Sequence, residues 1–160
     1  MMETMFSGSV VGIYIAPEAG APMESRSEVE ALANKGLDGD RYARAEGKFS
    51  GHKRPDQQRA VTLIEREALL AIFTEYGIEL GEELTRRNIV VEGVALNHLV
   101  GREFMVGEVR MLGVGLAEPC AYLEEISGVK ARQPLIHRGG LRAEVLTSGR
   151  IVVADKVTAV

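Results

Sequence analysis

Short apolar segments rich in β-branched residues follow one another along most of this sequence, and glycine, proline or other turn residues bound nearly all of them. This pattern predicts about eight or nine short strands. Regular helices do not alternate with the strands, so a doubly wound parallel sheet is not expected. The sequence therefore predicts a mostly β fold with a few helices, arranged as a closed or nearly closed β-barrel. The expected strands cover residues 9–15, 27–33, 60–64, 89–91, 103–106, 109–112, 111–116, 142–147 and 150–153, with a last one at Val157.

Two segments have helical spacing instead. Four apolar residues at positions i, i+3, i+4 and i+7 form one stripe of a helix that Gly77 ends. They are Leu69, Ile72, Phe73 and Tyr76, and we expect Tyr76 to lie in the core. A shorter helix is predicted around residues 123–126, closed by Gly128 in a left-handed turn. Residues 94–100 fit a single helical turn. Residues 27–33 could also start a helix, but no capping signal precedes them.

Turn signals connect several of these elements. Gly107-Glu108 suits a type II′ hairpin, and Ser148-Gly149 indicates a second hairpin between the strands that flank it. Residues 44–59 are polar and turn-rich, which predicts a long surface loop that is functional or disordered.

Length and charge limit the functional classes. A chain of 160 residues fits a single domain. The net charge of −4 disfavours a general nucleic-acid binder. No apolar run approaches the roughly 20 residues that span a bilayer, and the residues before Val10 lack the lysine or arginine of a signal peptide. We therefore expect a cytoplasmic protein that acts without membrane or nucleic acid.

Cys120 is the only cysteine, so an internal disulfide is excluded and a reducing compartment is favoured. Pro119 bends the chain between a strand and the short helix. The thiol is thus expected near the positive end of a helix dipole, where a thiolate is favoured as a nucleophile or metal ligand. The alternative is an inert cysteine that packs as a small apolar residue. The histidines, at positions 52, 98 and 137, show no metal-ligand spacing.

Three further loops carry arginine beside glycine or asparagine. They are Gly39-Asp40-Arg41, Arg87-Asn88 and Arg138-Gly139-Gly140. Guanidinium groups match phosphate and carboxylate oxygens, and neighbouring glycines let backbone N–H groups approach an anion. We expect Asp40 to organise its loop by accepting backbone N–H bonds. If folding gathers these loops, they surround Cys120 with anion-binding groups.

With these residues the chain resembles the MOSC domain, the C-terminal domain of molybdenum cofactor sulfurases, which also occurs as small stand-alone bacterial proteins. The likeness covers nearly the whole chain, so we expect residues 1–160 to form one MOSC-like domain. The motifs appear in the order typical of the family. They are Val10-Val11-Gly12-Ile13, Gly36-Leu37-Asp38-Gly39-Asp40-Arg41-Tyr42, Val61-Thr62-Leu63-Ile64, Arg87-Asn88-Ile89, Leu99-Val100-Gly101, Phe104, Val106-Gly107, Pro119-Cys120, Arg138-Gly139-Gly140-Leu141 and Asp155-Lys156-Val157.

The resemblance implies a barrel-like fold and a molybdenum cofactor (molybdopterin) as ligand. Cys120 would carry sulfur as a persulfide or ligate molybdenum, and Arg41, Arg87 and Arg138 would hold the phosphate. Asn88 would bond pterin or phosphate, or hold its loop, while Gly139 and Gly140 would belong to the binding loop. A cysteine desulfurase or a redox protein would be the partner.

Three functions remain open from the sequence. The first is a sulfurtransferase-like sulfur carrier, and the second is a molybdenum-dependent reductase of N-hydroxylated compounds. The third is a non-catalytic binding module with Cys120 in its core. Ala154 stands where the family usually has glycine before Asp155. The C-terminal helical segment of the longer reductases is not visible, nor is the pyridoxal-phosphate-binding, aminotransferase-like domain of the fused sulfurases.

Overall fold

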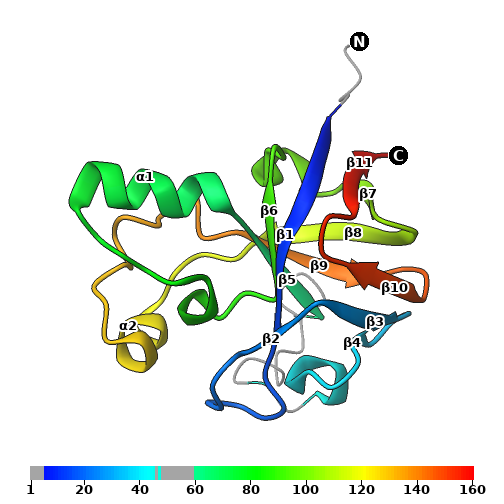
Figure 1. Ribbon diagram of the computed structural model, residues 1–160, viewed down its shortest axis with the longest axis horizontal. Coiled ribbons are helices and arrows are strands. Elements are labelled where there is room, and N and C mark those ends of the chain that lie inside the picture. Colours follow the sequence, from blue (N-terminus) through cyan, green and yellow to red (C-terminus); the bar gives the residue numbers. More distant parts are fainter. Residues whose placement is uncertain (1–5, 46, 48–59) are drawn as a thin grey trace.

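A closed β-barrel forms the centre of the computed structural model, which describes residues 6–45, 47 and 60–160 (Figure 1). Most of the loop expected at 44–59 lies outside the described residues. Seven strands follow the order β11-β7-β8-β9-β5-β6-β1, and pairing of β1 with β11 closes the ring. The barrel strands are β1 (Ser7–Ile15), β5 (Val61–Glu65), β6 (Ile89–Glu92), β7 (Glu103–Val106), β8 (Val109–Leu116), β9 (Leu141–Val145) and β11 (Lys156–Ala159). The expectation of a mostly β, closed barrel is confirmed.

The barrel is mixed. β5 and β6 run parallel because helix α1 (Arg66–Tyr76) crosses between them, whereas the other neighbouring strands of the ring are antiparallel. The predicted hairpin at Gly107-Glu108 is confirmed: Val106 pairs with Val109, and Gly107 has φ 58°. Alternate strand residues point inward and fill the barrel with large apolar side chains, so the interior is a packed core. Leu63, Phe104, Met111 and Leu141 are among the fully buried ones.

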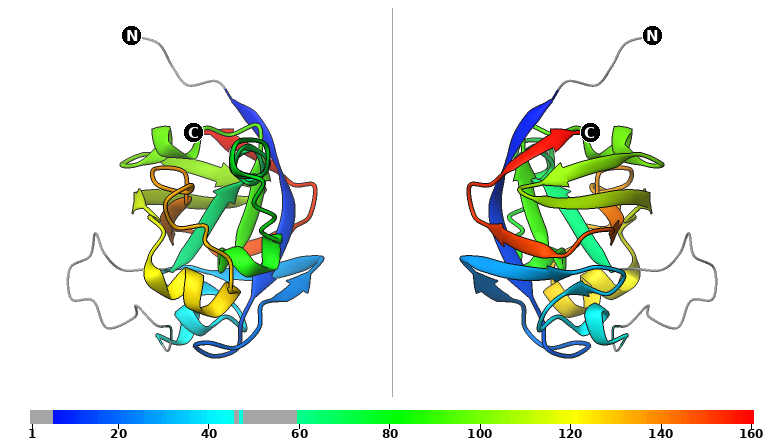
Figure 2. Two further views of the ribbon diagram at one scale, coloured as in Figure 1. Left: turned by 90° about the vertical axis from the view of Figure 1, so that its left-hand side faces the viewer. Right: turned by 90° about the vertical axis from the view of Figure 1, so that its right-hand side faces the viewer.

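A second, small sheet lies at one end of the barrel (Figure 2). It has the order β10-β3-β4, formed by β10 (Gly149–Val152), β3 (Glu28–Leu32) and β4 (Gly36–Leu37). The strand predicted at 27–33 is thus confirmed, but the hairpin predicted at Ser148-Gly149 is wrong. β9 stays in the barrel and β10 pairs with β3, because the chain changes sheets at this turn. A further short strand, β2 (Glu24–Arg26), extends the barrel sheet beside β1.

In the described residues, two α-helices and three 3₁₀ turns connect the strands. They are α1 (Arg66–Tyr76), α2 (Ala121–Ser127), and the 3₁₀ turns η1 (Arg41–Arg44), η3 (Glu82–Thr85) and η4 (Leu96–Leu99), the last of which confirms the helical turn predicted at 94–100. No helix in the described part of the chain is long and apolar enough to span a membrane.

A second apolar cluster joins α1 to α2. It contains Ile72, Leu80, Leu123, Ala131 and Leu135. The stripe predicted for α1 is only partly buried: Ile72 is fully covered, whereas Phe73 and Tyr76 are 51% and 58% exposed. The expectation that Tyr76 lies in the core is therefore wrong: the buried residues of α1 are Ala68 and Ile72, whereas Tyr76 is the last residue of the helix and stays exposed.

Candidate functional site

Cys120 lies at the corner between β8 and α2. The strand ends at Leu116, and Cys120 is the extended residue that caps α2, with φ −137° and ψ 174°. Cys120 is partly exposed as a residue and belongs to neither of the two buried apolar clusters.

Cys120 opens onto a small pocket that distant parts of the chain build together. Its cationic wall consists of Arg41 from η1 and of Arg86 and Arg87, which follow η3. The other lining residues are Tyr42, Glu118, Cys120, Tyr122 and Leu123. The free space between them is about 20 Å³, and a single water needs roughly 10–15 Å³ by this measure. Without movement of these side chains, a ligand can insert little more than one oxygen atom.

Asp40 and Arg41 form a buried pair at the start of η1. Asp40 Oδ1 accepts from Arg41 Nη1 at 2.9 Å and from the Ala16 N–H at 3.0 Å, and Oδ2 accepts from the Tyr42 N–H at 3.2 Å. The Arg41 guanidinium also lies 4.6 Å from the centre of the Tyr42 ring. Gly39, with φ 86°, supplies the left-handed turn that precedes this pair. Asp40 therefore positions both the loop and the arginine.

Arg87 ties two segments of the site together. Its Nε donates to the Gly139 carbonyl and its Nη2 to the Ala117 carbonyl, each at 2.7 Å. Both bonds are buried, and Ala117 lies shortly before Cys120 in the chain. Arg87 thus fixes the corner that carries the thiol, in addition to its positive charge at the pocket.

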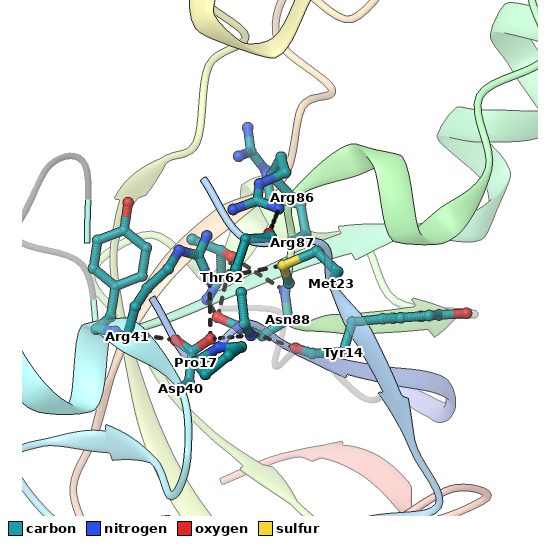
Figure 3. A network of polar contacts seen from close by, with 12 residues as sticks. Tyr14, Pro17, Met23, Asp40, Arg41, Thr62, Arg86, Arg87 and Asn88 are labelled. Carbon is teal, nitrogen blue, oxygen red and sulfur yellow. Dashed lines mark hydrogen bonds and ion pairs between the residues drawn. The ribbon is translucent and has the colours of Figure 1, made fainter. Parts of the chain in front are cut away.

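The buried side chain of Arg86 lacks hydrogen-bond partners for part of its guanidinium group. It is 8% exposed, and its Nη1 donates to the Ala21 carbonyl. Its Nε and Nη2 are buried without a hydrogen-bond partner. Burial, and secondly the charge of Arg41, lower the pKa of this guanidinium. Arg86 also holds a left-handed backbone, with φ 65°. Figure 3 shows Arg86 next to Arg87 in the polar network of the site. Unpaired buried nitrogens on a cation are costly, and an anion at this place would satisfy them.

Asn88 is fully buried beneath the arginines and does not line the pocket. Its Oδ1 accepts from the Thr62 N–H at 3.0 Å and from the Thr62 hydroxyl at 3.3 Å. Its Nδ2 donates to the Tyr14 carbonyl at 3.1 Å. Of the two roles implied for Asn88, the geometry supports holding the loop, because these bonds join β5 and β1 to the arginine segment.

We expect Asn88→Ala to lower the free energy of unfolding by about 3 kcal/mol, because it leaves buried partners on Thr62 and Tyr14 unpaired. Urea denaturation monitored by circular dichroism measures this cost. Asn97→Ala is the matched control: its amide donates to the His137 carbonyl at an exposed position, and we expect about 0.5 kcal/mol or less. Equal costs for the two variants would contradict the role of Asn88.

The third predicted loop, Arg138-Gly139-Gly140, contributes its glycines to the site but not its arginine. Arg138 is not among the residues that line the pocket. Its Nη2 pairs with Glu75 of α1 at 2.7 Å and its Nε donates to the Pro134 carbonyl at 2.8 Å. Gly139 provides the carbonyl that Arg87 binds, and Gly140, with φ 117°, packs directly on the backbone of β5. The two glycines therefore allow close chain packing behind the pocket.

Sequence reasoning missed Arg86, Glu118 and Tyr122 as lining residues. Arg86 had a signal, since it adjoins Arg87 and Asn88 in one polar triplet before a strand. Glu118 had none: it binds His137 through the His137 N–H at 2.7 Å and Nδ1 at 2.8 Å, a contact between segments far apart in sequence. In the described ranges, no three His, Cys, Asp or Glu side chains gather as a metal site.

Comparisons with known proteins agree with this architecture. The model of the MOSC domain family matches residues 38–158. The solved structure of the YuaD protein from Bacillus subtilis has a TM-score of 0.80 at 18% identity, covering 98% of this chain and 97% of that one. YiiM from Geobacillus stearothermophilus gives 0.70 at 14%, covering 96% and 75%, and YiiM from Escherichia coli gives 0.63 at 17%, covering 99% and 70%. No curated protein matches the sequence. At these identities, the solved structures establish a shared fold.

Proposed function

Because this chain belongs to the MOSC domain family, we propose that it binds a molybdenum-cofactor-type ligand and carries or transfers sulfur at Cys120. The proposal takes residues 1–160 as one domain. The observation that carries it is that the partly exposed Cys120 lines the same pocket as Arg86, a buried cation with two unpaired nitrogens.

The residues present fit a ligand that carries a phosphate and a metal that binds a thiolate. Arg86 and Arg41 would hold an oxygen of its phosphate, since guanidinium forks match phosphate oxygens and Arg86 has two nitrogens to offer. Cys120 would supply the soft thiolate that a redox metal accepts. When bound, the cofactor would supply a redox metal to which sulfur can be attached.

Sulfur loading requires the thiolate and an anionic donor. With thiosulfate, the Cys120 thiolate attacks the outer sulfur, the S–S bond of the donor breaks, and sulfite leaves with the bonding electron pair. The product is a cysteine persulfide anion, and no external oxidant or reductant is consumed. The cationic wall would stabilise the donor, the leaving sulfite and the persulfide, which are all anions.

Intact mass spectrometry after incubation with thiosulfate tests the proposal. We expect the wild-type protein to gain the mass of one sulfur atom, and a thiol reductant to remove it. Cys120→Ser is expected to gain nothing. Since Cys120 is the only cysteine, sulfur that persists on Cys120→Ser, or no sulfur on the wild type, would contradict the assignment.

The cofactor part of the proposal has its own test. Protein expressed in cells that make the molybdenum cofactor is purified, and molybdenum and pterin are measured separately. We expect pterin to remain with Cys120→Ser, because the arginines hold the phosphate, and to be lost from Arg86→Met. Molybdenum lost from Cys120→Ser with pterin retained would assign the thiolate as a metal ligand. Absence of both molybdenum and pterin from the wild type would contradict cofactor binding.

A lone reactive thiol is best preserved in a reducing compartment, so we propose that the protein acts in the cytoplasm. Sulfur at Cys120 must come from a donor and pass to an acceptor, and a cysteine desulfurase is the donor class that we propose.

A further inference from the structure

We infer that the outer surface of α1 is a docking site for a basic, apolar-anchored segment of another protein. This α1 face consists of Leu70, Phe73 and Tyr76 on the helix and of the partly buried Ile78 just after it. The inference does not rest on the role proposed for Cys120. In Figure 1, α1 extends outward from the barrel, and its inner side packs on the apolar cluster beneath it.

The α1 face exposes more apolar surface than a helix of this length needs to. Leu70, Phe73 and Tyr76 are 59%, 51% and 58% exposed, whereas Ile72 of the same helix is fully buried. Single exposed apolar residues are common, but a contiguous group on one helix indicates an interaction surface. The spacing of Leu70 and Phe73, three residues apart, suits a partner helix laid along α1.

A groove runs between α1 and the segment that follows it. It has a volume of about 420 Å³, which is within the range of roughly 300–1,000 Å³ for ligand sites. Leu69, Leu70, Phe73 and Ile78 line it, together with Glu79 and the ion pair that Arg66 forms with Glu82 at 2.9 Å. The floor is thus apolar and the rim has a net negative charge because Arg66 balances Glu82 but not Glu79, so the groove can take one or two large side chains of a partner with positive charge beside them.

Charge identifies the kind of partner. Residues 65–83 contain six glutamates and one arginine, a net charge of −5, whereas the whole chain has −4. The remainder therefore has a net charge of +1. Even when Arg138, which binds Glu75, is counted with this segment, its charge is −4. The acidic character of the protein is thus concentrated around the α1 face.

This concentration disfavours three other occupants. A second copy of the chain would bring two acidic faces together, and like charges across an interface cost several kcal/mol. An anionic membrane surface and a nucleic acid would be repelled for the same reason. A protein segment with lysine or arginine around leucine or phenylalanine has both the positive charge and the large apolar side chains that the α1 face requires.

The test uses a synthetic amphipathic peptide with leucines at helical spacing and lysines elsewhere, and an analogue in which glutamate replaces every lysine. Isotope-labelled wild-type protein is titrated with each peptide and followed by amide chemical shifts. We expect the lysine peptide to bind with a Kd in the micromolar range, to perturb amides of α1 and residues 77–83, and to weaken with salt. The glutamate peptide should not bind.

Two variants localise the contact. Phe73→Ser removes the anchor of the groove and Glu79→Lys reverses charge at its rim, and each is expected to weaken binding at least tenfold. Val152→Ser is the matched control, because Val152 is also exposed, at 37%, but lies on β10. If Phe73→Ser fails to fold, Glu79→Lys still tests the site.

Three results would overturn the inference: no binding of the lysine peptide, shifts centred away from α1, or equal binding by all variants. Sedimentation of the wild type tests whether a second copy of the chain occupies the α1 face instead. A dimer that Phe73→Ser abolishes would assign the α1 face to self-association and would also contradict the inference. None of these results depends on sulfur loading at Cys120.

Discussion

Gly140→Ala is expected to lower the free energy of unfolding by about 4 kcal/mol, one of the largest single-residue effects in this chain. Gly140 has φ 117°, which side chains of L-residues rarely adopt. A Cβ there would also overlap the carbonyl oxygen of Leu63 in β5. Backbone cannot turn aside as a flexible side chain does, so the Gly139-Gly140 segment or β5 must shift. The Gly140 carbonyl accepts from the Ala117 N–H at 2.8 Å, so the strain would reach the Cys120 corner.

Substitutions at two other glycines separate the two causes of this loss of stability, which are backbone strain and steric overlap. Gly128 has φ 72° with no atom within 4 Å of an added Cβ, so Gly128→Ala measures the backbone term alone, about 1 kcal/mol. At Gly113 the φ is not positive, but a Cβ would overlap the Leu99 carbonyl. Gly113→Ala therefore measures steric overlap, and we expect about 3 kcal/mol. Urea denaturation of the three variants gives these values. A Gly140→Ala cost no greater than that of Gly128→Ala would contradict the close packing on Leu63.

The fold was largely predictable because its signals are local. Turn residues and short β-branched runs marked the strands, and Gly107-Glu108 identified a true hairpin. The second expected hairpin failed because pairing partners are not encoded in the turn: β10 pairs with β3, which is more than 100 residues earlier in the chain. Periodicity also located α1, but it could not say which edge of a broad apolar stripe the barrel would cover.

The site was predictable in part for the same reason. Arginine and glycine in loops pointed to anion-binding groups, and Arg41 and Arg87 do line the pocket with Cys120. Arg138 faces Glu75, a partner that only the packing of α1 supplies. The position of Arg86 beside Arg87 was a sequence signal, but its left-handed backbone and its buried, unpaired nitrogens are tertiary properties that the sequence does not reveal.

Arg86→Met is expected to abolish stabilisation of the protein by oxyanions while leaving its own stability within about 1 kcal/mol of the wild type. The variant loses one bond to the Ala21 carbonyl, but it also removes a buried cation with two unpaired nitrogens. Inorganic phosphate at a hundredfold its Kd should add about 2.7 kcal/mol to the wild type. For a domain of this size that is a rise in Tm of about 8 °C. Arg86→Lys retains the charge and should keep part of the rise. A low Tm of Arg86→Met without phosphate would instead indicate a structural role.

The rate of alkylation of Cys120 measures the effect of the Arg86 charge at the thiol itself. Iodoacetate and iodoacetamide react by the same displacement, but only iodoacetate is an anion, so the ratio of their rates measures the local potential. We expect Arg86→Met to lower this ratio about tenfold, as the loss of one nearby positive charge predicts. Arg138→Met is the matched control, since Arg138 does not line the pocket and pairs with Glu75, and its ratio should stay within about twofold of the wild type. If the ratio falls equally in both variants, the effect comes from overall charge and contradicts a specific role of Arg86. If the ratio falls only in Arg138→Met, Arg138 is the anion-binding residue in place of Arg86.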